Sequence, residues 1–108
     1  MVRFDDISAA VADAAGARAR QIIEILSQLD EQALLAPSAL DGWSRLNVAC
    51  HLRYGAETLI AMKQYVLAGL PTSYDPGGRA RPRPGTLVPR ACETPHDVVG
   101  SLAHHTET

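Results

Sequence analysis

Apolar residues recur with helical spacing along two long segments of the chain. The first runs from about Asp5 to Leu29, and the positions of its stripe are separated by three or four residues. Because about 3.6 residues complete a helical turn, this spacing places them on one face of an amphipathic helix. The stripe consists of Ile7, Val11, Ala14, Arg18, Ile22, Ile25 and Leu29. Arg18 interrupts it, either as a side chain that snorkels at the edge of a bundle or as a cation that points into a polar cleft.

The second segment runs from about Arg45 to Ala68 and carries a stripe of the same kind. Its members are Val48, Leu52, Gly55, Leu59, Met62 and Val66. No stretch of the sequence alternates with the period of two that a half-buried strand requires. The pattern therefore predicts two long helices and no sheet.

Turn and cap signals define the ends of the second helix. Asp41-Gly42 is a turn signal, and Ser44 is a suitable N-cap because its hydroxyl can accept a bond from the first helical turn. Trp43 stands just before this cap, where it can pack on Val48 as a hydrophobic staple. Gly69 suits the end of the helix. These signals place the start of the second helix at Arg45.

The remaining segments are predicted to be connections and a third helix. Residues 30–41 form a connection in which a helix can still include Leu34 and Leu35 before Pro37 forces a break. Residues 70–93 contain five Pro and three Gly, so we expect a long crossover that is neither helix nor central strand. The Arg residues at 79–83 within it are read either as a solvated linker or as contacts to an anionic ligand. Thr94-Pro95 then opens a third helix, with its inner face formed by Val98, Leu102 and His105.

These elements predict an all-α fold. Two long helices joined by a short connection pack antiparallel, as in an up-and-down bundle, and 108 residues make one domain that spans positions 1–108. The third helix is about half as long as the others, so the set cannot bury both stripes well. We therefore expect the domain to be incomplete: either a fourth helix is missing, or a second copy of the chain supplies the cover.

Charge and cysteine content narrow the functional classes. A formal net charge of −2 gives no general attraction to nucleic acid or to an anionic membrane. The start lacks an apolar signal core, and no apolar run reaches membrane-spanning length, which favours a cytoplasmic location. Two Cys residues are too few for a disulfide scaffold and fit a reducing compartment. Cys50, inside a predicted helix, is interpreted as a small buried thiol.

Histidine gives the chain its candidate chemistry. Two ligands on one helix must be three or four residues apart to share a face, and no two of the four His residues are so spaced. The only such pair with ligand chemistry is His104 with Glu107. His51 lies beside the second stripe, so we expect it to face the bundle interior or its edge, as a core histidine or as a metal ligand. Cys50 and His51 are sequence neighbours on different sides of the helix, which argues against a catalytic dyad.

The segment around His51 resembles a family signature. The run Asp41-Gly42-Trp43-Ser44, followed by Val48-Ala49-Cys50-His51-Leu52, is similar to the pattern Leu-Pro-Gly-Trp-Ser/Thr … Val-x-x-His-Leu. That pattern marks the N-terminal domains of mycothiol-dependent maleylpyruvate isomerases, within the DinB/YfiT-like metalloenzyme superfamily. Ala36-Pro37-Ser38 is similar to the approach to the motif in that family. The resemblance covers the first two helices and the linker, about two-thirds of the chain.

The resemblance implies an up-down-down-up four-helix bundle with a long crossover after its second helix. It also implies a divalent metal, zinc or nickel, held by three side chains, of which His51 would be one. The other two would come from a His/Glu-x-x-x-His pair on a fourth helix, which these 108 residues do not include. The implied function is a metal-binding, thiol-dependent isomerase or transferase that uses mycothiol and acts on a small molecule of unknown identity, with no catalytic residue assigned. The alternative is a non-catalytic helical module that forms a homodimer to complete a bundle.

Overall fold

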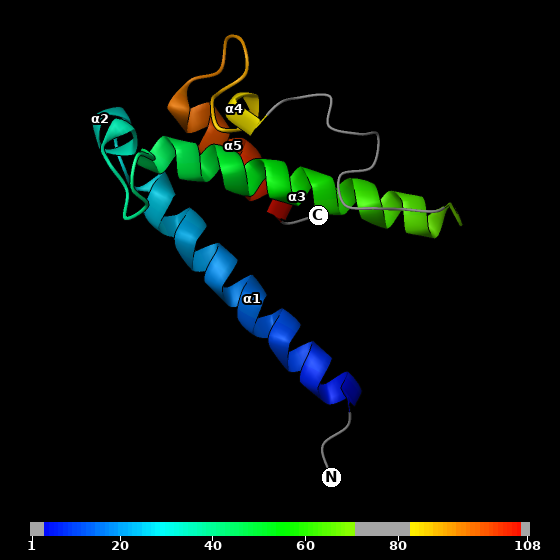
Figure 1. Ribbon diagram of the computed structural model, residues 1–108. Helices are drawn as coiled ribbons and strands as arrows, with labels where there is room; N and C mark the ends of the chain where they lie inside the picture. Colours follow the sequence, from blue (N-terminus) through cyan, green and yellow to red (C-terminus); the bar gives the residue numbers. More distant parts are fainter. Residues whose placement is uncertain (1–3, 71–82, 107–108) are drawn as a thin grey trace.

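The computed structural model of the protein describes residues 4–70 and 83–106, and these are helical without any strand (Figure 1). The prediction of an all-α fold is confirmed. The helices in chain order are α1 (Phe4–Ser27), α2 (Glu31–Leu35), α3 (Arg45–Leu67), α4 (Arg83–Thr86) and α5 (Pro95–Thr106). None of the described helices combines the length and the apolar character that a membrane crossing needs.

The helix α3 begins and ends where the sequence signals placed it. The Ser44 Oγ accepts a hydrogen bond from the backbone N–H of Asn47 at 3.0 Å, and the Asn47 Oδ1 accepts one from the N–H of Ser44 at 2.9 Å. This reciprocal pair is a capping box. Gly42 has a φ of +79° and Gly69 a φ of +72°, so both turns use the left-handed region that favours glycine.

Two short helices lie in segments that were predicted to be connections. The helix α2 is capped by Asp30, whose Oδ1 accepts a hydrogen bond from the N–H of Ala33 at 2.8 Å. The helix α4 contradicts the expectation that residues 70–93 contain no helix. A single turn needs few backbone hydrogen bonds, and Pro is tolerated in a first turn, so the Pro content did not exclude it. The Arg residues at 79 and 81 fall outside the described part of the chain.

The core of the molecule lies where α3 and α5 meet. These two helices form the main helix–helix contact, and α1 packs mainly on α5. The helix α5 starts beside the end of α1, where the His96 Nε2 lies 3.1 Å from the Leu29 carbonyl oxygen. Its inner face is buried as predicted at Val98 and Leu102. The buried apolar residues are Leu26, Leu34, Leu46, Ala49, Cys50, Val98, Val99 and Leu102.

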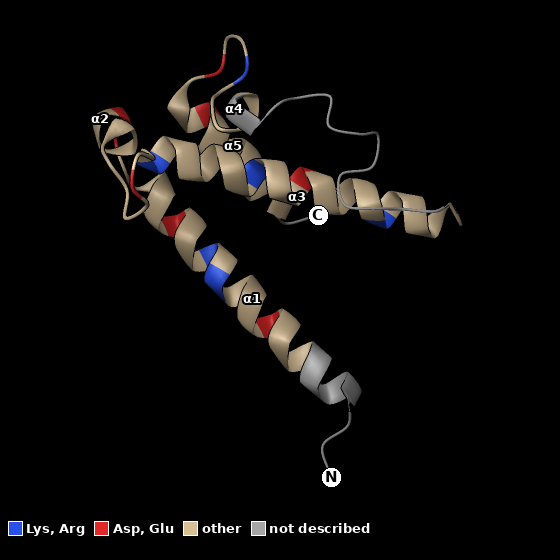
Figure 2. Cartoon of the chain, in the orientation of Figure 1, with Lys and Arg blue, Asp and Glu red and all other residues tan. Residues whose placement is uncertain are grey.

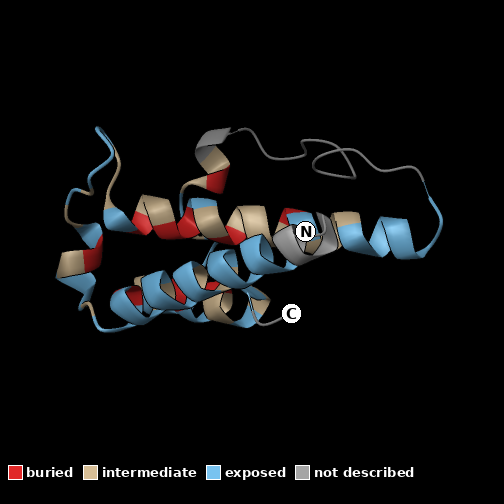
Figure 3. Ribbon diagram, turned by 90° about the horizontal axis from the view of Figure 1, so that it is seen from below, coloured by how far each residue is buried: buried red, intermediate tan, exposed pale blue. Residues whose placement is uncertain are grey.

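The two stripes that the sequence pattern identified supply none of these buried residues, although Leu29 and Leu52 pack against the core. Val11 and Ile25 on α1 are 62% and 58% exposed, and Leu59 and Val66 on α3 are both 61% exposed. Figure 3 shows α1 exposed over most of its length. The helix α1 instead buries Leu26, which follows Ile25 by one residue and so lies about 100° from it around the helix. As expected, the described helices leave much of both stripes uncovered.

Candidate functional site

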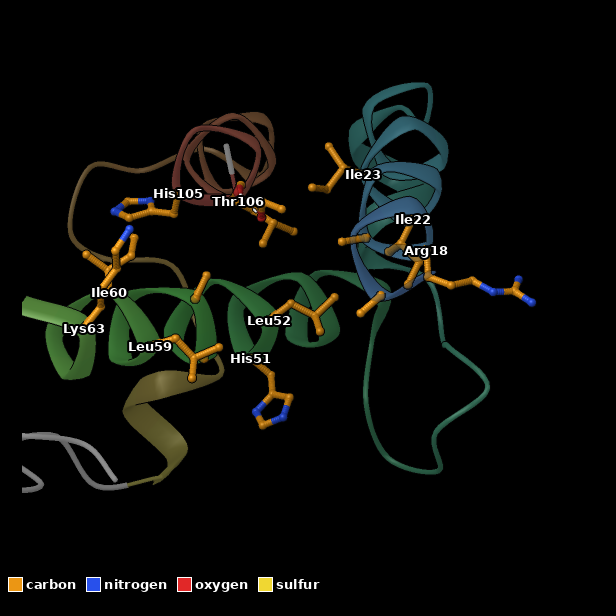
Figure 4. A pocket seen from close by; sticks show the side chains of 15 residues that line it. Arg18, Ile22, Ile23, His51, Leu52, Leu59, Ile60, Lys63, His105 and Thr106 are labelled. Atoms are coloured by element: carbon orange, nitrogen blue, oxygen red, sulfur yellow. Dashed lines mark hydrogen bonds between the residues drawn. The ribbon is translucent and has the colours of Figure 1, made fainter. Parts of the chain in front are cut away.

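An open cleft lies between α1, α3 and α5 (Figure 4). The ribbon in Figure 1 shows that α1 diverges from α3. The volume of the cleft is about 620 Å³, and its wall is mostly apolar. The lining residues are Ala15, Arg18, Ala19, Ile22, Ile23, His51, Leu52, Gly55, Ala56, Leu59, Ile60, Lys63, Leu102, His105 and Thr106. Parts of both exposed stripes thus face this cleft, which makes it the candidate binding site.

His51 lies at the edge of the cleft and is exposed to solvent. Its ring meets the edge of Trp43, with the ring centroids 5.4 Å apart and the planes at 68°. Ala49 and Cys50 lie on the buried face of α3. His51 is the next residue, so its side chain is turned by about 100° from that of Cys50 around the helix axis. The prediction that His51 faces the interior or its edge is therefore correct only for the edge.

The described residues do not make up a complete metal site. No three of their His, Cys, Asp and Glu side chains converge. His51 is one candidate ligand, and Glu107, the predicted partner of His104, lies outside the described residues. Burial raises the pKa of the Cys50 thiol, although the charge of Arg53 opposes this, so Cys50 favours the neutral thiol over the thiolate that binds metals. The prediction of Cys50 as a buried thiol is confirmed.

A charged network that the sequence analysis did not identify joins α3 to the segment before α5 (Figure 2). The Arg53 side chain, in a residue only 2% exposed, donates a hydrogen bond from Nη1 to the Glu93 Oε2 at 2.5 Å. The other Glu93 oxygen accepts from the backbone N–H of Arg90 at 2.7 Å. The Arg90 Nη2 donates to both Glu57 oxygens at 2.6 and 2.8 Å. The spacing of Arg53 and Glu57 by four residues was the only sequence signal of this cluster.

The pKa shifts within the network follow from these contacts. The hydrogen bond from Arg53 lowers the pKa of Glu93, with the Arg90 backbone N–H adding to the effect against a smaller contribution of burial. Burial acts to lower the pKa of Arg53, but its hydrogen bond and ion pair with Glu93 outweigh that effect and the pKa is raised. Both groups therefore stay charged at neutral pH and act as a structural clamp.

His105 occupies the end of the cleft beside this network. Its Nδ1 lies 2.7 Å from the Ser101 carbonyl oxygen, and its Nε2 lies 3.7 Å from the Glu57 Oε2. A carbonyl oxygen can only accept, so the hydrogen bond places a proton on Nδ1. His105 was predicted to belong to the inner face of the third helix, and the structure places it half-buried there.

Comparisons of the chain with protein-family models, with curated proteins and with solved structures each returned no match. Function must accordingly be argued from the cleft, from His51 and from the sequence motif around it.

Proposed function

We propose that this chain is a DinB-like helical protein that binds a small organic molecule in the cleft between α1, α3 and α5. The observation that carries the proposal is the cleft itself: it is concave, largely apolar and of the size of small-molecule sites, which are about 300–1,000 Å³. The resemblance of the segment around Trp43 to the maleylpyruvate isomerase motif supports the same proposal, because His51 stands at the edge of this cleft.

The activity that we propose on this basis is a thiol-dependent isomerisation or transfer, with zinc or nickel and mycothiol as cofactors. His51 would supply one metal ligand, and the other ligands would come from groups outside the described residues. A divalent metal would supply Lewis-acid activation of a bound thiol or water. The part proposed for the described residues is to hold His51 on α3 and to present the apolar wall of the cleft to the bound molecule. No catalytic step is assigned to any of them.

Metal analysis of the purified protein tests this proposal. After incubation with zinc or nickel and removal of free metal, we expect metal in a fixed ratio to the chain. His51→Ala should lose most of this metal. Mutation of a residue that only supports a metal ligand already lowers metal affinity by roughly tenfold or more. Removal of one of three protein ligands should therefore lower the affinity at least as much.

His96→Ala is the matched control, since His96 is an exposed helical His that does not line the cleft. Metal that is retained in the His51 variant, or that is lost equally in the two variants, would show that His51 is not a ligand.

Self-association is the second candidate function. It is favoured by the large apolar side chains that α1 and α3 leave exposed, among them Val11, Ile25 and Val66. A second copy of the chain would cover them and complete a larger bundle. The test is whether the mass of the particle in solution rises with protein concentration.

A further inference from the structure

All ionisable side chains in the wall of the cleft are basic. They are Arg18 on α1, His51 and Lys63 on α3, and His105 on α5. Within the described part of the chain, no Asp or Glu contributes to this wall. An apolar surface with cations at its margin favours a molecule that has an apolar body and a negative group.

Lys63 is the basic group best placed to hold an anion in the cleft. Figure 4 shows the guanidinium of Arg18 extending away from α3 and α5, and the ring of His51 pointing away from α5. Lys63 lies toward the end of the cleft where α5 finishes, on the same side as His105. Among the ion pairs of the described residues, none engages Lys63. Its ammonium charge is therefore available to a ligand.

The carboxylate of Glu57, which lies beside this end of the cleft, is already bound. Glu57 Oε2 lies 3.7 Å from the His105 Nε2, but both Glu57 oxygens accept hydrogen bonds from Arg90. This bidentate ion pair offsets the carboxylate charge. Glu57 consequently does little to weaken the attraction of Lys63 for an anion.

The apolar wall indicates how long the ligand is. From Leu52 to Lys63 the wall follows α3 over eleven positions, and at a rise of about 1.5 Å per residue this is roughly 16 Å. We infer that the cleft binds an apolar monocarboxylate of medium-chain fatty-acid length, with the carboxylate on the Lys63 ammonium. The hydrocarbon body lies against Leu52, Leu59 and Ile22. The inference rests on the proposed use of the cleft as a ligand site, and it names the class of ligand.

Calorimetric titration of the full chain with decanoate and with decan-1-ol tests this inference. The two probes share a chain length and differ in the anionic group. We expect one decanoate to bind per chain and decan-1-ol to bind about tenfold more weakly, because a hydrogen bond to a charged group is worth that factor or more. Equal affinity for the two probes, or many weak decanoate sites per chain, would overturn the inference.

Two variants test whether Lys63 is the residue whose charge binds the carboxylate. Lys63→Met keeps the length of the side chain, so it should weaken decanoate binding about tenfold and leave decan-1-ol unchanged. Arg20→Met removes an exposed cation of α1 that does not line the cleft, and it should change neither affinity. An equal effect of the two substitutions on decanoate would contradict a specific role of Lys63.

Chemical protection gives an independent readout. Lys63 is the only lysine of the chain, so its acylation by an amine-reactive reagent can be followed by peptide mass analysis without interference from other side-chain amines. Decanoate should slow the acylation of Lys63, and decan-1-ol should not. A rate that decanoate leaves unchanged would contradict the inference.

The two proposals fail separately. Loss of metal in the His51 variant with no preference for decanoate would retain the metal proposal and reject the inference. A preference for decanoate that depends on Lys63, with no metal bound, would retain the inference and reject the metal proposal.

Discussion

Arg53 is the buried charge on which the docking of the pre-α5 segment depends. A guanidinium that is removed from water loses its hydration, and Glu93 compensates by accepting its hydrogen bond. Because Glu93 also accepts from the backbone of Arg90, the pair fixes the chain from residue 90 to residue 93 against the middle of α3. Removal of either partner leaves the other without compensation.

Replacement of the carboxylate therefore destabilises the fold. Glu93→Gln keeps the shape of the side chain but leaves the buried Arg53 charge unpaired, and we expect a loss of about 2 kcal/mol in the free energy of unfolding. Chemical denaturation at neutral pH measures it. Glu24→Gln, at an exposed position of α1, is the control and should change stability by less than about 0.5 kcal/mol. A similar loss in both variants would show that the ion pair has no special role.

The same pair predicts a dependence on pH. The pKa of Glu93 in the folded state is lowered from its ordinary value of 4.5, so an unfolded chain takes up the proton at higher pH than the folded chain does. The stabilisation is full above 4.5 and is lost as the pH falls through the lower folded-state value. The advantage of the wild type over Glu93→Gln should accordingly shrink in acid, and a constant difference across that range would refute it.

At the scale of single elements, the ends of helices were predictable and their packed faces were not. The cap at Ser44 and the glycine at 69 are local signals, because a helix end must satisfy its own free backbone groups. The stripe through Val11 and Ile25 shows that α1 has an apolar face, but spacing does not say what covers it. The structure packs the neighbouring face, at Leu26, against α5 instead.

The candidate site was likewise predictable from the sequence only where local signals determine it. The sequence singled out His51, and the start of α3 at Arg45 determines which way that side chain points. The sequence did not predict the cleft, because the wall combines residues of three helices whose relative angles depend on long-range packing. Arg53 and Glu93 were missed because forty positions separate them.

The capping box of α3 gives a prediction at this scale. Ser44→Ala removes the acceptor of the Asn47 N–H, and we expect it to cost about 1 kcal/mol of stability. Thermal or denaturant unfolding measures the loss. Ser27→Ala is the control, because the Ser27 hydroxyl donates to the Glu24 carbonyl on an exposed turn and caps no helix start. If Ser27→Ala cost as much as Ser44→Ala, the cap would not be the cause.

On the scale of the whole molecule, the exposed stripes distinguish a monomer from an assembly. Ile25 on α1 and Val66 on α3 are exposed and do not line the cleft, so a change there leaves the proposed ligand wall intact. In a monomer, a charge at these positions remains in water. In a dimer that buries them, the same charge becomes costly.

Sedimentation equilibrium separates these cases. If the protein self-associates through the stripes, Ile25→Glu should weaken the dimer by about tenfold or more. Gln28→Glu adds the same charge at an exposed position outside the stripe and should leave the dimer unchanged. If Ile25→Glu leaves the dimer intact, the interface lies elsewhere. If the protein is a monomer at all concentrations, self-association is rejected as the second candidate function.

The attachment of α1 has a mechanical consequence. The helix is held near its C-terminal end, where Leu26 joins the core, and the cleft residue Ala15 lies eleven residues away, about 16 Å along the axis. A rotation of α1 by roughly 10° about Leu26 would move Ala15 by about 3 Å over that length. Small repacking at a single leucine can thus change the width of the cleft by nearly the thickness of an alkyl chain.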